Sequence, residues 1–253
     1  MRAIGVLIAI LGLATSSVFL SPSGAAAKTV CPVDPLPGST ISGGLVVTGG
    51  DCHLVHVTVT GGITVTSTGS LEIENDSYIS GGIVVQTGGE LDVGHDLRGN
   101  TPSGSLPSTI TGGVKFNGKD LDLYRATISG GVLIDGAGPF FFPSVCGSTI
   151  SGGLAVQNVS TGAFIGDPGE GFPANCPGNV INTSVKVLNS TGVVEIESNQ
   201  ISGSVTITNS RYELRDNSIG GSATCTGSTP NLVEGGEASP PGNTYGGSNN
   251  GCV

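Results

Sequence analysis

The sequence predicts an all-β protein, a right-handed parallel β-helix of about nine to ten coils stacked as a solenoid. Two observations lead to this fold class: an apolar residue returns at similar intervals along the chain, and the short runs around it alternate apolar with polar residues. Glycine pairs separate these runs, and 44 glycines among 253 residues make the chain rich in turns. Each coil can bury its inward residues only by stacking on its neighbours.

The repeating unit has the form Thr-Ile-Ser-Gly-Gly-Val-x-Val. Its anchor residue falls at Ile41, Val59, Ile79, Ile110, Ile128, Ile150, Ile181, Ile201, Ile219 and Tyr245. Most anchors are 18 to 22 residues apart, which is one coil, whereas two gaps are 31 residues long. The longer gaps predict insertions near 94–108 and 165–178, on the same side of the solenoid because they share the same phase of the repeat.

Alternation with a period of two residues identifies the strands, as at Leu71 and Ile73. A helix is excluded because a glycine pair in each unit would cost about 2 kcal/mol relative to alanine. A β-propeller blade needs about 40 residues and a sandwich has no fixed period, so neither fits. A left-handed β-helix requires an apolar residue every six positions, and His53 and Ser77 break that pattern. The right-handed form is therefore favoured.

A polar residue stands two positions before most anchors. These residues are Ser39, Ser77, Ser108, Ser148, Asn179, Asn199, Asn217 and Asn243, and the exceptions are Val57 and Ala126. Stacked Ser and Asn at one bend can hydrogen-bond from coil to coil, so this row predicts a structural ladder.

The first residues have the layout of a secretory signal peptide. Arg2 precedes an apolar stretch, and three alanines ending at Ala27 form a cleavage site. We therefore expect a signal peptide over 1–27 and a single mature β-helix domain over 28–253 that is secreted, extracellular and monomeric. No second apolar run is long enough to span a membrane.

All six cysteines lie in the mature part, and an even number in an exported chain indicates disulfides. Six cysteines allow 15 pairings, and the alternative of a metal site lacks a Cys-x-x-Cys motif. Because neighbouring cysteines are about one coil apart, pairing in sequence order is predicted. The expected bridges are Cys31 to Cys52, Cys146 to Cys176 and Cys225 to Cys252.

The charge composition excludes one class of partner. Charged residues make up 11% of the chain and the formal net charge is −10, which leaves no basic stripe for phosphate contacts. Nucleic acid is therefore not expected as a partner.

The repeat form over about residues 39 to 250 resembles the right-handed β-helix proteins of the pectate-lyase-like superfold, and in particular small secreted bacterial members without a catalytic motif. Enzymes of that superfold use calcium-binding Asp with catalytic Arg or Lys, or paired Asp with a Gly-His-Gly segment. Here Gly94-His95-Asp96 only approaches the second pattern, and no adjacent Asp pair exists. The resemblance thus implies the architecture rather than a reaction.

A row of outward carboxylates is the first candidate site. Glu72, Asp92 and Asp122 fall on three successive coils, about 5 Å apart, with Glu90 and Asp120 beside them. Such a row favours a Ca²⁺ site that bridges to an acidic polysaccharide. The alternative is a solvated sheet face, partly compensated by nearby basic residues.

Two further groups carry weaker hypotheses. His95, Asp96 and Arg98 in one loop have the residue types of an acid, a base and a charge clamp, although three residues so close in sequence seldom face one point. The run Phe140 to Phe142 fits either core filling, a coil cap or a shelf for a glycan.

A threonine and serine array surrounds the anchors. Thr40, Thr58, Thr109, Thr127 and Thr149 precede an anchor, and a hydroxyl residue often follows it. The array resembles the ice-facing surface of β-helical ice-binding proteins, but threonine is also common in strands.

Together these features predict a non-catalytic extracellular rod that is structural or binds a polysaccharide or another surface polymer. The alternative is a lyase or hydrolase acting on an acidic polysaccharide, and a further alternative is ice binding.

Overall fold

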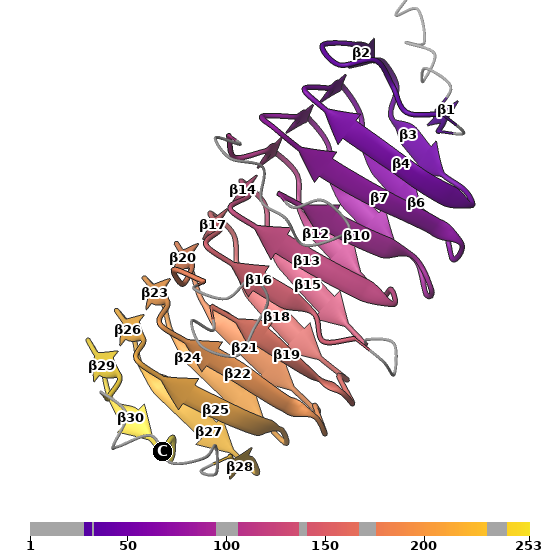
Figure 1. Cartoon of the computed structure of the whole chain (residues 1–253). Helices are drawn as coiled ribbons and strands as arrows, with labels where there is room; N and C mark the ends of the chain where they lie inside the picture. The colour runs from indigo at the N-terminus through magenta and orange to yellow at the C-terminus, as the bar shows by residue number, and fades with distance from the viewer. Residues whose placement is uncertain (1–27, 32, 95–105, 137–140, 167–175, 232–241) are drawn as a thin grey trace, which may run out of the picture.

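A computed structural model describes residues 28–31, 33–94, 106–136, 141–166, 176–231 and 242–253. Within these ranges the chain forms thirty short strands and no helix, and all the strand pairs are parallel (Figure 1). The strands stack into three sheets that make a parallel β-solenoid of about nine turns. The predicted fold class is confirmed. The expected signal peptide at 1–27 lies outside the described residues.

Each coil contributes one strand to each of three sheets, here called A, B and C. Sheet A contains β1 (Thr29–Val30), β3 (Leu45–Val47), β6 (Ile63–Val65), β9 (Ile83–Val85), β12 (Val114–Phe116), β15 (Val132–Asp135), β18 (Leu154–Gln157), β21 (Val185–Leu188), β24 (Val205–Thr208), β27 (Ala223–Thr226) and β30 (Asn249–Asn250). Sheet B contains β2 (Thr40–Ile41), β5 (Thr58–Val59), β8 (Tyr78–Ile79), β11 (Thr109–Ile110), β14 (Thr127–Ile128), β17 (Thr149–Ile150), β20 (Val180–Ile181), β23 (Gln200–Ile201), β26 (Ser218–Ile219) and β29 (Thr244–Tyr245). Sheet C contains β4 (Gly50–Val55), β7 (Gly69–Glu74), β10 (Glu90–Val93), β13 (Asp120–Tyr124), β16 (Ser144–Cys146), β19 (Gly162–Ile165), β22 (Val193–Glu197), β25 (Arg211–Arg215) and β28 (Thr229–Pro230).

The predicted anchor residues form one continuous inward row on sheet B. Ile41 pairs with Val59, and the same register continues coil by coil to Ile219 and Tyr245. A second row, which begins at Leu45 and Ile63, runs along the inside of sheet A, and Leu71 and its equivalents line sheet C. Nearly all of these side chains are fully buried, so the core is a stack of aliphatic residues.

Glycine pairs occupy the corner between sheets B and A because successive coils approach each other closely there. A Cβ atom added at Gly112 would lie 2.3 Å from the backbone nitrogen of Gly82, and one at Gly130 would lie 2.5 Å from that of Gly113. No side chain fits in such a space. Two positions after the anchor, the unbroken stack of glycine pairs ends at Gly152 and Gly153, and the next coil has a Thr and a Ser in their place.

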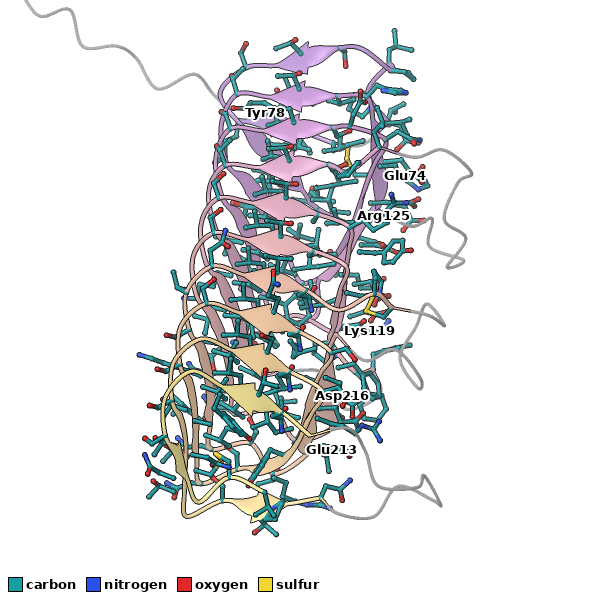
Figure 2. The ribbon with its side chains drawn as sticks, turned by 90° about the vertical axis from the view of Figure 1, so that its left-hand side faces the viewer. Glu74, Tyr78, Lys119, Arg125, Glu213 and Asp216 are labelled. Carbon is teal, nitrogen blue, oxygen red and sulfur yellow. A yellow bond between two sulfur atoms is a disulfide. The ribbon has the colours of Figure 1, made fainter. Side chains whose placement is uncertain are left out.

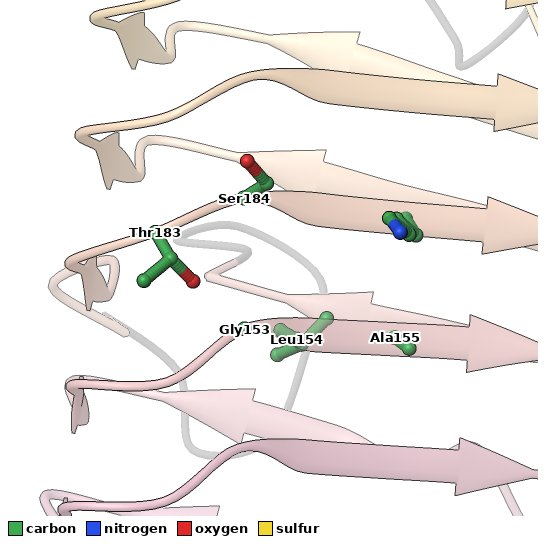
Figure 3. Close-up of a pocket in the computed structure, with 6 residues that line it drawn as sticks. Gly153, Leu154, Ala155, Thr183 and Ser184 are labelled. Atoms are coloured by element: carbon green, nitrogen blue, oxygen red, sulfur yellow. The ribbon is translucent and has the colours of Figure 1, made fainter.

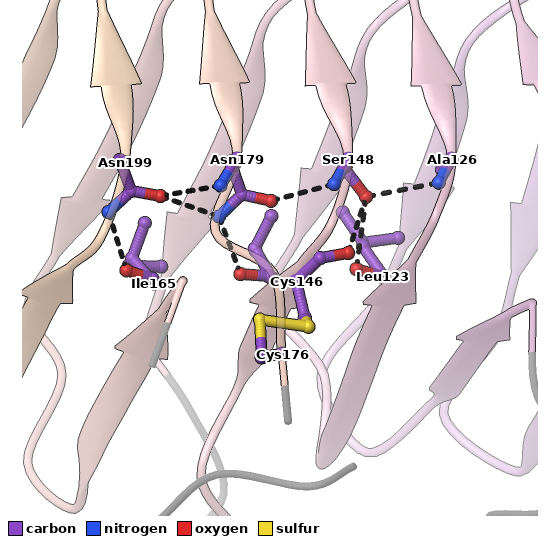
Figure 4. The surroundings of a disulfide bond; sticks show 9 residues. Leu123, Ala126, Cys146, Ser148, Ile165, Cys176, Asn179 and Asn199 are labelled. Atoms are coloured by element: carbon purple, nitrogen blue, oxygen red, sulfur yellow. Dashed lines mark hydrogen bonds between the residues drawn. A yellow bond between two sulfur atoms is a disulfide. The ribbon is translucent and has the colours of Figure 1, made fainter. Parts of the chain in front are cut away.

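The predicted Ser and Asn ladder is present at the bend between sheets C and B (Figure 4). The backbone N–H of Ser148 donates to Oδ1 of Asn179 at 2.9 Å, and the N–H of Asn179 donates to Oδ1 of Asn199 at 3.0 Å. The exceptions join the same ladder, since the N–H groups of Val57 and Ala126 donate to the serine hydroxyl of the following coil. The ladder therefore holds the register of the coils on both sides of an insertion.

The three disulfides pair as predicted. Cys31 is bonded to Cys52, Cys146 to Cys176 and Cys225 to Cys252. The first and last bridges lie near the two ends of the solenoid, and the middle one closes the segment that contains the second insertion (Figure 4). Three disulfides are typical of proteins that fold in an oxidising compartment.

Long connections and charged residues gather on one side. The segments after β10, β19 and β28 all leave sheet C and enter sheet B, and they contain the described ends of both predicted insertions. In Figure 2 sheet B faces the viewer, and the labelled charged side chains lie along its right-hand edge, whereas Tyr78 lies on sheet B itself, to their left. No helix of the described residues is long and apolar enough to cross a membrane.

Candidate functional site

The carboxylates that the repeat aligns do stand in one row on sheet C. Glu72 pairs with Asp92, and Asp92 pairs with Asp122, while Glu90 pairs with Asp120 two residues earlier in the same strands. The row continues across Ser144 and Phe164 to Glu195 and Glu213.

Burial divides this row into two parts. The side chains of Glu72, Asp92 and Glu195 are buried, and Glu72 is only 1% exposed. Oε2 of Glu72 lies 3.5 Å from Nδ1 of His53 on the neighbouring strand. The hypothesis of a solvated carboxylate face is therefore wrong for these three residues. Glu90, Asp120 and Asp122, by contrast, are half-buried and reach the surface.

In the described part of the chain, no three His, Cys, Asp or Glu side chains are arranged to hold a metal ion. The carboxylate row on sheet C therefore contains no such group. His95, Asp96 and Arg98 lie outside the described residues.

Three phenylalanines lie on the coils that follow the accessible carboxylates. Phe141 is 41% exposed and Phe142 is 48% exposed, so neither fills the core. The ring of Phe142 packs at a tilt against that of Phe164, with 5.3 Å between the ring centroids. Phe164 lies in the same outward row of sheet C as Asp122, two coils further on, with Ser144 between them.

Lys119 links the rings to the acids. Its ammonium lies 2.5 Å from Oε1 of Glu90 and 5.2 Å from the ring centroid of Phe141. We call Glu90, Lys119, Asp120, Asp122, Phe141, Phe142 and Phe164 the acidic–aromatic cluster. It lies in the middle of the rod, on strands β10, β13 and β19 and the segments that adjoin β13 and β16.

Burial and neighbouring charges raise the pKa of two carboxyl groups in the cluster. Burial, followed by repulsion from Asp120, raises the pKa of Asp122 to about 7, although a hydrogen bond with Ser144 opposes the change. Burial and the charge of Glu90 also raise the pKa of Asp120. The hydrogen bond and the charge of Glu90 raise the pKa of Lys119. Near neutral pH, Asp122 can therefore either donate or accept a hydrogen bond.

The outer face of sheet B has a different character. The residues before the anchors are Thr40, Thr58, Tyr78, Thr109, Thr127, Thr149, Val180, Gln200, Ser218 and Thr244, and those after them are Ser42, Thr60, Ser80, Thr111, Ser129, Ser151, Asn182, Ser202, Gly220 and Gly246. Neither row contains a charged side chain. Threonines pair in register, as Thr109 does with Thr127 and Thr127 with Thr149.

The sequence identifies the carboxylates as a candidate site and offers the phenylalanine run as a glycan shelf only beside two structural alternatives. The pattern around Phe141 does not distinguish core from surface, and the structure shows that its side chain is exposed. One signal was available: Phe164 occupies the same outward position as Glu72 and Asp122 in its own repeat. An aromatic residue at a position otherwise held by carboxylates indicates a surface contact rather than core packing.

No model of a known family, no curated protein and no solved structure matches the chain. What the structure supports of the resemblance stated above is the parallel β-solenoid itself.

Proposed function

We propose that the protein is a non-catalytic extracellular rod that binds an uncharged polysaccharide through the acidic–aromatic cluster on sheet C. One observation carries the proposal: Lys119 contacts both the exposed ring of Phe141 and the half-buried carboxylate of Glu90, in the middle of the rod. The N-terminal sequence and the three disulfides support the extracellular location.

The aromatic rings suit the apolar side of a sugar. A pyranose ring presents C–H groups on its faces and hydroxyls at its edge, so its faces pack on a phenyl ring while the hydroxyls remain free. Phe141 and Phe142 are adjacent in sequence and both exposed, which gives a polymer chain two contact points.

The carboxylates suit the hydroxyl edge of a sugar. An ionised carboxylate accepts hydrogen bonds only, and sugar hydroxyls donate them. One lysine faces three carboxyl groups, Glu90, Asp120 and Asp122, so the cluster has no surplus positive charge that would attract an acidic polymer. An uncharged polysaccharide is therefore the partner class that the cluster fits best.

The test measures depletion of the purified protein from solution by insoluble polysaccharides and its binding to soluble ones. The double variant Phe141→Ala and Phe142→Ala should weaken binding by at least about tenfold, since buried aromatic contacts dominate most interfaces. Tyr78→Ala is the matched control, because Tyr78 is also exposed (42%) but lies on sheet B.

Two results contradict the proposal. Equal loss of binding in the Tyr78 variant and in the double phenylalanine variant would show that the cluster is not the site. New reducing ends or unsaturated products released from any polysaccharide would show an enzyme, and Asp122→Asn would then be the first variant to assay for lost turnover.

Ice binding is a second candidate, and the two uncharged rows of sheet B favour it. Three successive coils carry Thr109, Thr127 and Thr149 in register, each followed two positions later by another hydroxyl residue. Tyr78, Val180 and Gln200 interrupt the first row. Thermal hysteresis that is present in the protein and absent in Thr127→Lys, but retained in Thr64→Lys on sheet A, would support this function. No hysteresis would remove it.

A further inference from the structure

The outer face of sheet B differs from the other two faces because it carries no charge. Its ten described strands form a straight stack (Figure 2), and the rows on either side of the anchors contain only uncharged residues. Sheets A and C both carry charged side chains on their outer faces, among them Lys115, Lys186 and Glu90. Two copies of a chain with a net charge of −10 repel each other. Sheet B is the face through which they can approach with the least repulsion.

A notch bounds this face at the corner with sheet A (Figure 3). It has a volume of about 400 Å³ and is lined by Gly153, Leu154, Ala155, Thr183, Ser184 and Lys186. The small side chain of Ala155 stands between the longer Leu133 and Lys186 in the outer row of sheet A, which leaves the notch open. None of the lining residues belongs to the two rows beside the anchors, so the notch does not interrupt the face of sheet B.

Two large apolar side chains interrupt the hydroxyl row that precedes the anchors. Among the described strands of sheet B, Tyr78 on β8 is 42% exposed and Val180 on β20 is 38% exposed. In the register of the sheet, Thr109 separates Tyr78 from Thr127. On the other side, Thr149 separates Val180 from Thr127. The two apolar side chains therefore lie at equal distances from Thr127, about 10 Å away in opposite directions along the rod.

This spacing makes the face complementary to itself. When two antiparallel rods face each other across sheet B, a two-fold axis along the strand direction passes through Thr127. Tyr78 of one copy then lies opposite Val180 of the other, and the same contact occurs twice, as an isologous interface requires. Every other facing pair in the two rows is uncharged. Parallel rods would instead keep Tyr78 and Val180 about 20 Å apart along the interface.

We propose that the protein forms a weak antiparallel dimer through the outer face of sheet B, centred on Thr127, with Tyr78 of each copy against Val180 of the other. With the strand spacing and rise of a β-sheet, the face is about 43 Å long and about 10 Å wide. The dimer thus buries about 900 Å² in total, below the roughly 1,200–2,000 Å² of stable complexes. The monomer expected from the sequence is therefore the state in dilute solution. Sheet C takes no part in the contact, so this proposal and that of polysaccharide binding can fail separately.

Charges at the rim of the face determine how the dimer responds to salt. Arg125 lies at the bend before β14, so the axis through Thr127 brings the two copies of Arg125 to the same place on the rim. Salt screens this repulsion and the repulsion between the two acidic chains. Raising the ionic strength from about 0.02 M to about 0.3 M should therefore strengthen association by about threefold or more. Weaker association at the higher ionic strength would show that ion pairs hold the dimer and would overturn the uncharged interface.

Sedimentation equilibrium of the purified protein measures the dimer from about 10 μM to about 1 mM, the range of weak association. Tyr78→Lys and Val180→Glu should each weaken dimerisation by at least about tenfold, because each places an unpaired charge opposite an apolar side chain. Val84→Glu is the matched control. Val84 is 42% exposed on strand β9 of sheet A, so its replacement should leave dimerisation unchanged.

The double variant Tyr78→Lys and Val180→Glu tests the antiparallel register. The introduced lysine of each copy would face the introduced glutamate of the other, so the double variant should regain the affinity that the single variants lose. The two positions are about 20 Å apart within one copy, which excludes an ion pair inside the same chain. No recovery, an equal loss in Val84→Glu, or a monomer at every concentration would each overturn the proposal. A monomer whose thermal hysteresis disappears in Thr127→Lys would assign the face to ice instead.

Discussion

Sheets B and C are built from the same coils, yet they differ in regularity. Sheet B consists of two-residue strands whose outer rows carry no charge. Sheet C has strands of two to six residues, its outer face holds carboxylates and phenylalanines, and three long connections leave it. The difference shows that the close coil contacts next to sheet B maintain the solenoid, so that sheet C can vary in sequence and carry the candidate site.

The largest effect is expected from the link between these two regions. The Cys146–Cys176 disulfide joins β16 of sheet C to the segment that precedes β20 of sheet B, with a sequence separation of 30 residues. Replacing both cysteines by serine should lower the free energy of unfolding by about 3.5 kcal/mol, because the unfolded chain regains the entropy of an open loop. Chemical denaturation checks this. An unchanged midpoint would show that the ladder alone maintains the register.

Where glycine pairs stack on glycine pairs, the corner beside sheet B should tolerate no side chain. Gly112→Ala is expected to destabilise the protein by about 3 kcal/mol, because its Cβ would overlap the backbone of the previous coil. Gly153→Ala is the control, since there the nearest atom, the carbonyl oxygen of Ser184, would be 3.3 Å away, and it should cost less than about 1 kcal/mol. Equal losses in the two variants would refute the argument from close approach.

Asparagines in the buried Ser and Asn ladder should contribute more to stability than asparagines on the surface. Asn199→Ala should cost about 2 kcal/mol, since it leaves the N–H of Asn179 and the carbonyl of Ile165 without their partner. Asn182→Ala, on the exposed face of sheet B, should change stability by less than about 0.5 kcal/mol. Thermal unfolding of both variants tests the distinction, which fails if Asn182→Ala proves as costly as Asn199→Ala.

The last effect depends on pH and concerns the charge on sheet C. The pKa of Asp122 is raised from 3.8 to about 7 in the folded state, so folding favours the protonated form. Its contribution to stability is complete below pH 3.8 and is lost as the pH rises through about 7. Asp122→Asn should therefore raise the melting temperature relative to the unsubstituted protein at pH 8.5 but not at pH 3.5. A difference that does not depend on pH would contradict this assignment.

The period of the repeat made the fold, the Asn ladder and the disulfides predictable. The spacing of residues such as Ile41, Val59 and Ile79 identified which residues stack, because in a solenoid equivalent positions must meet in the next coil. The same logic located the Asn ladder and paired Cys31 with Cys52. These features follow from local spacing, and so they could be derived before the structure was known.

The candidate sites were less predictable, because they depend on which surface remains uncovered. Alternation showed that Glu72 and Asp122 point the same way, but not that Glu72 is buried and Asp122 reaches the surface. The contact of Lys119 with Phe141 joins two coils through a long side chain, and no repeat pattern specifies it.

The sequence by itself determined the coil, its register and the residues of the core, because burying an aliphatic row requires a regular period. Only the tertiary structure decided which carboxylates are accessible, which phenylalanines are exposed and where the notch at Ala155 opens. The physical reason is that the period sets the direction of each side chain, whereas exposure depends on neighbouring coils and connections that are distant in sequence.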